Sequence, residues 1–410
     1  MSFAEREFEK HCWAEIDLDA VRQNYRTVKQ HTGELPLCAV VKADAYGHGA
    51  VECARVLAEE GVRWFAVSCL REAMQLRQTV LWDEDRYGIL VLGRTDPALA
   101  GQLLQWDITQ TCHSKEYAFA LHSALKQTDL VGMLPIHLKL DTGMGRLGYP
   151  LRTDFERAMD ELRFTLCLPR LQATGIYQHF AAADECSEDS AAYTAEQYEL
   201  FCRAVTELLP GFDEPEEALV HCSNSAAAML HPDWPAGLPR QQCMARPGII
   251  LYGFDPSGEV RFDAFRPAMK LKSVVSQVKT VQPGQSVSYG RHFTAAAPTR
   301  VATLCAGYAD GYPRQLSCGK GVVELHGVPC PVVGNVCMDQ MMIDVSALPD
   351  DAVHPGDEAI LWGGTVSDSA ETVAQKTGTI PYEILCGVAR RVPRVYTKNG
   401  RVTAVDDFLQ

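Results

Sequence analysis

Eight short apolar runs lie between residues 37 and 252, and longer amphipathic stretches separate them. This alternation is typical of repeated βα units around a parallel sheet, and eight strands are the number that closes a barrel. Asp19 is expected to cap an early helix, which would carry Val21, Tyr25 and Val28 inward. The predicted strands are residues 37–41, 64–68, 89–92, 108–111, 136–140, 173–177, 219–222 and 247–252.

The pattern changes after about residue 266 to β-branched runs broken by glycine and proline, such as VVSQVKTVQPGQSVSYG and GVVELHGVPCPVVGN. These runs predict a mainly antiparallel β domain. The best linker candidate is DPSGEVRFD, residues 255–263. We therefore expect an N-terminal strand over 1–18 that joins the β domain, an α/β barrel of the (β/α)8 type over 19–265, and the β domain over 266–410.

The composition excludes several classes of partner. The 52 acidic and 38 basic residues give a formal charge of -14, which repels nucleic-acid phosphates and anionic membranes. The first thirty residues lack the apolar core of a signal peptide, and no later stretch approaches the roughly 20 apolar residues that span a bilayer. The 15 cysteines form no Cys-x-x-Cys pair, so we expect reduced thiols and no metal site in a soluble, cytoplasmic protein.

Lys42 ends the first predicted strand, and a glycine-bearing turn follows it in the sequence VVKADAYGHG. In a βα barrel, catalytic groups gather at the C-terminal ends of the strands. A lysine at this place is either a solvated flank or a functional amine. In a partly desolvated barrel mouth, such an amine would lose proton affinity and could form an imine with an aldehyde.

The fifth predicted strand carries His137, Lys139 and Asp141 in alternation with apolar residues. Period two places these three polar side chains on one face of the strand. Because a barrel strand is covered on both sides, the three must either pair in an internal row of salt bridges or serve a site. The glycines of the following TGMGR run would allow a bend that swings Arg146 over the pocket.

The later strand ends also carry polar residues. Ser225 in HCSNS and the backbone amides of Gly248 and Ile249 in RPGII are donors of the kind that bind a phosphate. His179 in QHFA is either a hydrogen-bonded structural histidine or a member of the site. These residues alone do not decide between the alternatives.

Seven segments, taken in chain order, resemble the alanine racemase family, and the likeness covers nearly the whole chain. They are VVKADAYGHGA (40–50), LKLDTGMGRLG (138–148), HCSNSAA (221–227), RPGIILYG (246–253), GYADGYPR (307–314), VGNVCMDQMM (333–342) and YEILCGVARRVPRVY (382–396). The lysine segment has relatives in other barrel enzymes, whereas its combination with GYADG and CMDQ is far more specific. The resemblance implies a homodimeric enzyme with shared active sites that uses pyridoxal 5'-phosphate to interconvert L- and D-alanine for peptidoglycan.

The resemblance also implies roles for single residues. Lys42 would hold pyridoxal phosphate as an internal aldimine, and Arg246 would face the pyridine nitrogen of the cofactor. The other cofactor-binding residues would be Tyr46, His179, Asn224, Ser225, Gly248, Ile249 and Tyr382. A guanidinium beside the ring nitrogen should discourage its protonation, which would limit side reactions such as transamination.

Racemisation removes a proton from one face of Cα and returns it to the other, so two acid/base groups are needed. By resemblance these are Lys42 and Tyr308, and Tyr308 would reach the cofactor of the partner subunit. A phenol titrates near 10, and lowering its pKa to about 7 requires roughly 4 kcal/mol of preferential stabilisation of the phenolate. His179 and Arg246 are the expected sources of that stabilisation.

Arg146 and the backbone amide of Met338 would orient the substrate carboxylate, with Asp339 in support. Lys139 matches a lysine that the family often carries as a carbamate, which would then hold Arg146. Small departures from the common pattern occur at Gln178 and Asn335, and they leave the substrate preference open.

Three alternatives remain at this point: a serine or broad-specificity racemase, a barrel-type decarboxylase using the same cofactor, and a cofactor-binding protein without turnover. Binding of the substrate carboxylate by the cation of Arg146 disfavours decarboxylation, because in that reaction the carboxylate must leave. A second domain that carries Tyr308 disfavours a protein without turnover.

Overall fold

The computed structural model describes residues 8–33, 35–83, 86–234 and 236–408. These residues form two compact units. The barrel unit comprises residues 21–45 and 50–265, and the β unit comprises the described residues of 1–20, 46–49 and 266–410. Each of the fifteen cysteines is a free thiol. None of the helices in the described ranges is long and apolar enough to cross a membrane.

Parallel strands form the wall of the barrel unit, in the order β2-β3-β4-β5-β6-β8-β9, and the short β7 pairs with β6. Their bounds are β2 (Cys38–Val40), β3 (Trp64–Val67), β4 (Gly88–Val91), β5 (Thr109–Cys112), β6 (Leu134–Asp141), β7 (Tyr149–Pro150), β8 (Leu171–Tyr177) and β9 (Leu219–His221). Sequence periodicity therefore located the first seven strands of the barrel correctly.

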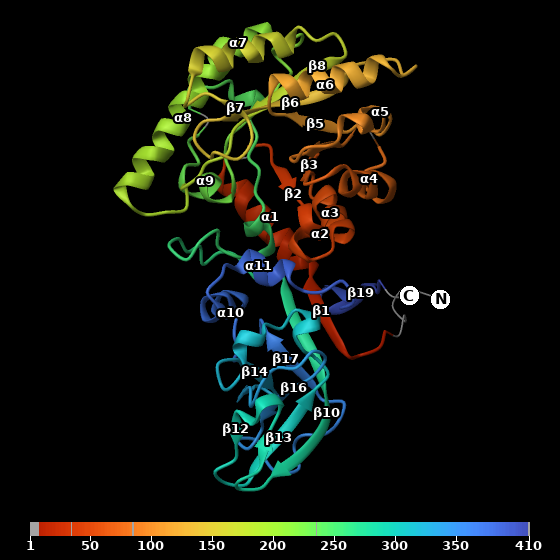
Figure 1. Ribbon diagram of the computed structural model, residues 1–410, viewed down its shortest axis with the longest axis vertical. Helices are drawn as coiled ribbons and strands as arrows, with labels where there is room; N and C mark the ends of the chain where they lie inside the picture. The colour runs from red at the N-terminus through yellow and green to blue at the C-terminus, as the bar shows by residue number, and fades with distance from the viewer. Residues whose placement is uncertain (1–7, 34, 84–85, 235, 409–410) are drawn as a thin grey trace. The chain divides into compact units, whose positions relative to one another are not determined.

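Helices connect these strands, and Figure 1 shows α4, α5 and α6 on the outer side of the sheet. The bounds are α1 (Leu18–His31), α3 (Ala50–Glu59), α4 (Leu70–Thr79), α5 (Ala100–Gln105), α6 (Lys115–Lys126), α7 (Phe155–Leu166), α8 (Glu188–Leu208) and α9 (Ser225–Leu230). Because helices cover the outside and side chains fill the inside, β6 is buried on both faces over most of its length.

The eighth strand was predicted over residues 247–252, and this prediction is wrong. Residues 249–252 form a 3₁₀ helix, η5 (Ile249–Tyr252), whose apolar side chains are all buried. The eighth position of the barrel is filled by the preceding irregular segment, in which Cys243 bridges to Val220 of β9 and Ala245 bridges to Leu37. Pro247 ends this series of main-chain hydrogen bonds. Its carbonyl accepts a hydrogen bond from the N–H of Val40, but proline has no N–H to donate.

The cap of α1 also differs from the prediction. The carboxylate of Asp17, two residues before Asp19, accepts hydrogen bonds from the backbone N–H groups of Asp19 and Ala20. The helix therefore begins at Leu18, one residue before the predicted cap. Its inward face is as predicted, since Val21, Tyr25 and Val28 are buried.

The segment predicted as a linker is bonded to the barrel unit. Glu259 accepts a hydrogen bond from the backbone N–H of Cys186, and the Ser257 hydroxyl donates to the carbonyl of Asp184. The border between the two units lies between Phe265 and Arg266, just after this segment.

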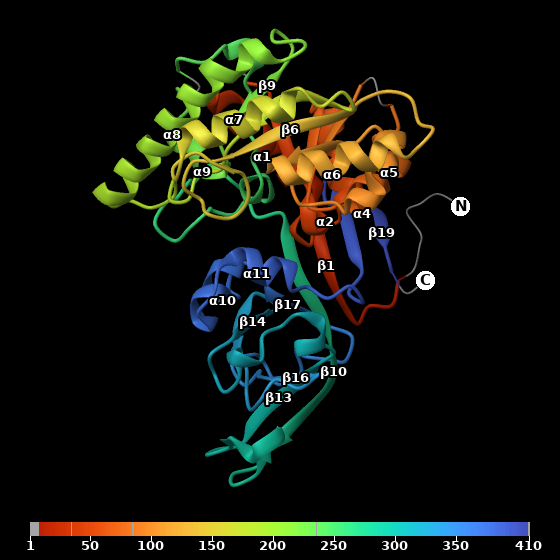
Figure 2. The same ribbon diagram turned by 45° about the horizontal axis from the view of Figure 1, so that its top comes forward.

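A mainly antiparallel sheet forms the β unit, in the order β15-β14-β17-β10-β1-β18-β19, with β13 between β10 and β16. The bounds are β1 (Cys12–Asp17), β10 (Met269–Val281), β13 (Thr299–Leu304), β14 (Val322–Leu325), β15 (Val328–Pro331), β16 (Met341–Asp344), β17 (Glu358–Trp362), β18 (Arg394–Lys398) and β19 (Arg401–Asp406). The N-terminal strand β1 pairs antiparallel with β10 and parallel with β18. Helices α10 (Ala370–Thr377) and α11 (Pro381–Cys386) lie side by side at one end of this sheet (Figure 2).

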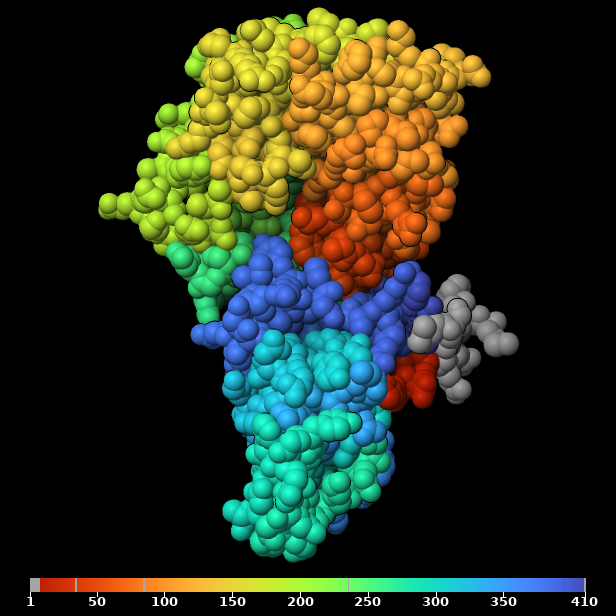
Figure 3. Space-filling model, viewed as in Figure 1, coloured from red at the N-terminus to blue at the C-terminus, as the bar shows by residue number. Residues whose placement is uncertain are grey.

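A small hairpin extends the other end of the β unit. It consists of β11 (Ser286–Val287) and β12 (Phe293–Thr294), and the 3₁₀ helix η6 (Tyr289–Arg291) joins them. The hairpin packs on a separate apolar cluster, which includes Val281, Val301 and Met342. In the space-filling view, this blue-green part of the β unit lies away from the blue α10 and α11 (Figure 3).

Candidate active site

Lys42 follows β2 directly and opens an unusual turn. Ala43, Asp44, Ala45 and Tyr46 all have φ between 52° and 54°, so four consecutive residues other than glycine form a left-handed helical turn. Left-handed backbone is unfavourable for L-amino acids with a Cβ, and it persists only where the surroundings hold it in place. The lysine is half-buried and stands at the first strand end, where the sequence predicted it.

The polar row on β6 lies inside the barrel. His137 and Lys139 are buried, and the carboxylate of Asp141 accepts hydrogen bonds from the backbone N–H groups of Gly143 and Gly145. None of the salt bridges between described residues includes a member of this row, so the alternative of an internal salt-bridge row is wrong. Asp141 instead shapes the loop that leads to Arg146, which is exposed.

Lys139 is a buried amine among cations. Its Nζ donates to the carbonyl of Leu140 at 3.0 Å and lies 5.1 Å from the centre of the Tyr177 ring. Burial, followed by the charge of Arg246, lowers the pKa of Lys139 to about 7. Asp141 opposes this shift, and Arg146 adds a smaller lowering effect. A substantial fraction of this amine is therefore neutral at physiological pH.

A hydrogen-bonded chain of His137, His221 and Arg246 crosses the barrel interior. Arg246 Nη1 donates to Nδ1 of His221 at 2.9 Å, and Nε2 of His221 lies 2.9 Å from Nδ1 of His137. Because a guanidinium can only donate, His221 carries its proton on Nε2 and donates to His137, which then carries its own proton on Nε2. Burial and the charge of Arg246 lower the pKa of both histidines, that of His137 to about 3, so both rings are neutral.

Arg246 is fixed from several sides. Nη1 also donates to the carbonyl of His221 at 2.7 Å, and Nη2 donates to the carbonyl of Gln178 at 2.7 Å. The guanidinium carbon lies 5.0 Å from the centre of the Tyr177 ring, which stacks on His221. Tyr177 therefore contacts Lys139, His221 and Arg246, yet the sequence marked it only as the last residue of a strand.

The pKa of His179 indicates that positive charge is concentrated at this end of the barrel. Burial and then the charge of Arg246 lower its pKa well below the usual histidine value. Lys139, Arg146 and Lys42 act on it in the same direction. We call these four cationic side chains, Lys42, Lys139, Arg146 and Arg246, the cation cluster. Such a cluster at one end of a barrel suits an anionic ligand.

Three of the predicted phosphate-binding residues, Ser225, Gly248 and Ile249, lie in the barrel unit, whereas Tyr46 and Tyr382 lie in the β unit. The Ser225 hydroxyl accepts a hydrogen bond from the backbone N–H of Gly248 at 2.9 Å, so the start of α9 meets the start of η5. Asn224 caps α9 by accepting a hydrogen bond from the N–H of Ala227. The structure thus brings Ser225, Gly248 and Ile249 to one place and gives Asn224 the role of shaping the loop.

The other predicted site residues belong to the β unit. The rings of Tyr46 and Tyr382 are 5.8 Å apart, and burial raises the pKa of Tyr46 well above its ordinary value. A side chain at Gly47, where φ is +82°, would place its Cβ 2.4 Å from the carbonyl oxygen of Leu385 on α11. Glycine at this position therefore allows residues 46–49 and α11, which belong to the same unit, to approach closely.

Tyr308 and Met338 are held side by side on the β unit. The backbone N–H of Tyr308 donates to Cys337, and the next N–H, of Ala309, donates to Met338. Tyr308 is 42% exposed and Met338 is 53% exposed, so both are presented at the surface of the unit. Arg391 bridges the carboxylates of Asp310 and Asp339, at 2.8 Å and 2.7 Å, and thereby joins the two segments.

Sequence reasoning missed Tyr289, which lies in the VSYG run of the β domain. Of the 14 tyrosines, only Tyr289, at 73%, and Tyr308 are exposed. The φ of Ser288 is 69° and that of Gly290 is 73°, so Tyr289 stands between two left-handed residues. Non-glycine residues in this region of φ are a signal for functional sites.

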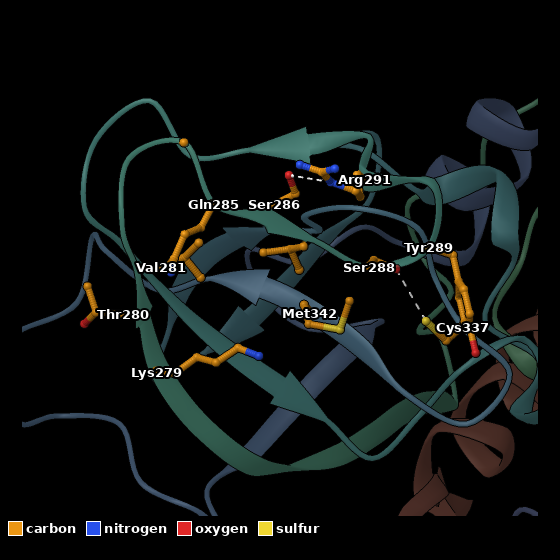
Figure 4. Close-up of a pocket in the computed structure, with 12 residues that line it drawn as sticks. Lys279, Thr280, Val281, Gln285, Ser286, Ser288, Tyr289, Arg291, Cys337 and Met342 are labelled. Atoms are coloured by element: carbon orange, nitrogen blue, oxygen red, sulfur yellow. Dashed lines mark hydrogen bonds between the residues drawn. The ribbon is translucent and has the colours of Figure 1, made fainter.

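Tyr289 also contacts the segment that holds Tyr308. The amide group of Asn335 donates to the carbonyl of Tyr289 at 2.7 Å, and the Ser288 hydroxyl donates to the carbonyl of Asn335 at 2.6 Å. Figure 4 shows Tyr289 and Ser288 beside Cys337 at the edge of a hollow of about 900 Å³. Tyr289 and Tyr308 are thus both anchored to residues 335–338.

These features define a class of protein: a βα-barrel protein whose C-terminal strand ends carry a cluster of cations suited to an anionic ligand, with a β unit that presents exposed tyrosines. Comparison with known proteins is consistent with this class. The family model described as the alanine racemase N-terminal domain matches residues 16–256, and the model of the C-terminal domain matches residues 268–396. The chain therefore belongs to the alanine racemase family of isomerases.

Individual relatives match over almost their whole length. The chain is 39% identical to alanine racemase 1 of Clostridium acetobutylicum over 97% of this chain and 98% of the relative. It is 41% identical to the alanine racemase of Geobacter sulfurreducens, over 93% and 96%. Among solved structures, the alanine racemase of Clostridium difficile has a TM-score of 0.87 at 37% identity, covering 98% of this chain and 100% of that one. The Bacillus anthracis alanine racemase with bound L-Ala-P has a TM-score of 0.85 at 33% identity, covering 98% and 99%.

Proposed function

We propose that this protein interconverts L- and D-alanine with pyridoxal 5'-phosphate held at Lys42, and supplies D-alanine for peptidoglycan in the cytoplasm. The observation that carries the proposal is the cation cluster at His179, which includes a lysine at a barrel strand end. The relatives named alanine racemase, and the neighbour with bound L-Ala-P, support alanine as the substrate. Family membership also removes the decarboxylase alternative, whereas serine or a broader set of amino acids remains a second candidate.

The residues present fit this cofactor. Its phosphate is an anion, and the Ser225 hydroxyl and the Ile249 amide are donors at the starts of α9 and η5. The Gly248 amide donates to Ser225 in this structure, and it is proposed to turn to the phosphate when the cofactor binds. Tyr46, Tyr382, Asn224 and His179 are the further residues proposed to line the site. When bound, pyridoxal phosphate withdraws electrons from Cα of the amino acid and so makes its proton removable.

Arg246 is proposed to face the ring nitrogen of the cofactor. Its bonds to His221 and to main-chain carbonyls hold the guanidinium in one orientation, and a guanidinium keeps its proton at any physiological pH. Facing the nitrogen, it withholds the proton that would make the ring a stronger electron sink. The consequence is a reaction restricted to proton removal and return.

Lys42 and a tyrosine of the β unit are the proposed acid/base pair. Lys42 accepts or returns the Cα proton on one face, and a phenol serves the other face. Tyr308 is the proposed phenol, reaching the site of a partner subunit in a homodimer. The exposure and the backbone strain at Tyr289 make it the competing candidate.

The substrate carboxylate is proposed to bind Arg146 and the amide of Met338, with Asp339 holding that segment through Arg391. Lys139 is proposed to react with carbon dioxide: its neutral amine forms the N–C bond, the nitrogen then loses a proton, and an anionic carbamate results. The lowered pKa of Lys139, about 7, supplies the neutral amine. The anion would then pair with Arg146 in a pocket otherwise rich in cations.

The proposal is tested by incubating the purified protein and pyridoxal phosphate with L-alanine, L-serine or other L-amino acids, and separating the products on a chiral column. We expect D-alanine as the main product and none from Lys42→Ala. Formation of D-serine at a greater kcat/KM would establish the second candidate. Absence of any D-amino acid would refute the racemase.

Subunit mixing identifies the phenol. Neither Lys42→Ala nor Tyr308→Phe should be active alone, but mixed dimers should regain one intact site if Tyr308 acts on the partner's cofactor. The matched experiment uses Tyr289→Phe in place of Tyr308→Phe. If Tyr308→Phe keeps its activity while Tyr289→Phe loses it and is complemented, Tyr289 is the acid/base group and the assignment to Tyr308 is wrong.

A further inference from the structure

The left-handed turn after Lys42 must be held by something other than its own sequence. Residues 43–46 contain no glycine, and each adopts a φ that is unfavourable for a residue with a Cβ. In the unconstrained chain these residues would relax to right-handed or extended backbone. Since Lys42 is covalently continuous with the turn, such relaxation would redirect its side chain.

The carboxylate of Glu72 accepts two main-chain hydrogen bonds at this place. Oε1 lies 2.8 Å from the N–H of Ala43, the first left-handed residue, and Oε2 lies 2.7 Å from the N–H of Ser68. Ser68 directly follows β3, and Glu72 stands in the first turn of α4. One carboxylate therefore ties the turn after β2 to the end of the neighbouring strand.

The far side of the same turn has an attachment of its own. The carboxylate of Asp44 accepts a hydrogen bond from the N–H of Ala50, the first residue of α3, at 2.7 Å. Inside the turn, the N–H of Ala45 donates to the carbonyl of Val41. Glu72 thus contacts the residue that directly follows Lys42, and it does so from another helix, α4.

We propose that Glu72 is a positioning residue for Lys42: by accepting hydrogen bonds from Ala43 and Ser68, it maintains the left-handed turn that aims the lysine amine at the cofactor. This inference rests on the proposed role of Lys42. Glu72 touches the main chain of the turn and not the reacting atoms, so it acts through Lys42. A carboxylate is required because both of its oxygens must accept, and hydrogen bonds to an ionised acceptor are the stronger kind.

Glu72→Gln tests the proposal with almost no change of shape. The amide has one accepting oxygen, and its NH2 group would face a backbone N–H, so one of the two contacts is lost. We expect pyridoxal phosphate, titrated by its near-visible absorbance, to bind about tenfold more weakly, the loss of one charge-assisted hydrogen bond. Borohydride labelling of Lys42, followed by peptide mapping, should be slower at saturating pyridoxal phosphate. Glu52→Gln is the matched control, because Glu52 lies on α3 and pairs at the surface with Arg55.

Rescue distinguishes positioning from a general effect on folding. Glycine adopts positive φ without a steric penalty, so Ala43→Gly lowers the free energy of the left-handed turn. In the double variant Glu72→Gln/Ala43→Gly, we expect labelling of Lys42 and affinity for pyridoxal phosphate to recover in part. If Glu72 only stabilised α4, Ala43→Gly would restore neither.

The outcomes separate this inference from the proposed function. Wild-type protein that is never labelled at Lys42 would refute the proposed function. Labelled wild type, together with a Glu72→Gln variant whose affinity and labelling rate lie within twofold of it, would overturn the inference alone. A Glu72→Gln variant that is folded but impaired, and that Ala43→Gly fails to rescue, would also overturn it.

Discussion

Replacing Lys139 with methionine should stabilise the protein free of cofactor and carbon dioxide, and the gain should depend on pH. Lys139 is buried, and its pKa is about 7 instead of 10.5. At 1.36 kcal/mol per pKa unit, this difference corresponds to about 5 kcal/mol of unfavourable free energy for the charged amine in the fold. Methionine has similar length and no charge, so it removes that penalty.

The sign of the effect follows from linkage. Below pH 7 the amine is protonated in both the folded and the unfolded chain, so the full penalty of about 5 kcal/mol is present. Between pH 7 and 10.5 the unfolded chain binds more protons than the folded one, and the wild type gains stability as the pH rises. At pH 8.5 the remaining difference between Lys139→Met and wild type should be about 3 kcal/mol, and it should vanish near pH 10.5.

Urea unfolding at pH 6.5, 8.5 and 10 measures this difference directly, in degassed buffer without bicarbonate. Lys126→Met, on the exposed end of α6, is the control and should show no such trend. Equal stability of Lys139→Met and wild type at all three pH values would refute the reasoning. Adding bicarbonate should stabilise the wild type and leave Lys139→Met unchanged, if the carbamate forms.

Three further predictions concern the remaining contacts. Gly175→Ala would place a Cβ 2.6 Å from Nε2 of His137, so we expect a loss of about 1–3 kcal/mol in urea unfolding together with weaker cofactor binding; unchanged stability would show that the ring moves freely. Asp17→Ala should destabilise the protein by about 1 kcal/mol through the lost helix cap, and unchanged stability in thermal unfolding would contradict the cap. Arg246→Glu should raise the ratio of pyruvate to D-alanine formed from L-alanine by about tenfold, since a carboxylic acid can protonate the ring nitrogen; an unchanged ratio would contradict its proposed role.

The period and spacing of apolar residues in the sequence were sufficient to predict most of the barrel strands. The first seven strands appear where the apolar runs predicted them, because each run is buried on both sides and bounded by polar turns. The same reasoning failed at residues 247–252, where an apolar run is equally buried as a 3₁₀ helix. Burial alone does not distinguish a strand from a short helix. The segment that fills the eighth position is held by isolated bridges and has no apolar period to reveal it.

Different signals in the sequence pointed to different residues of the candidate site. Lys42 follows a predicted strand, Lys139 lies in the polar alternation of the fifth strand, and Arg246 was assigned by resemblance; in the structure all three charges lower the pKa of His179. Tyr289 was missed because one tyrosine in a β-rich run is ordinary for a strand, and only its exposure and backbone conformation mark it. Glu72 gave no signal because an acidic residue in the first turn of a helix is common.

The irregular segment that fills the eighth position of the barrel fixes how far apart two groups of the proposed site lie along the chain. Arg246 lies two residues before Gly248, so the guanidinium proposed to face the cofactor ring and the amides proposed to bind its phosphate are carried by one short stretch of chain. The bridges at Cys243 and Ala245 fix the register of that stretch with its two neighbours, at Val220 and Leu37. A single-residue deletion between them would rotate the arginine from the inside of the barrel to the outside, so insertions and deletions should be tolerated far less in this stretch than in the loops at the opposite end of the barrel.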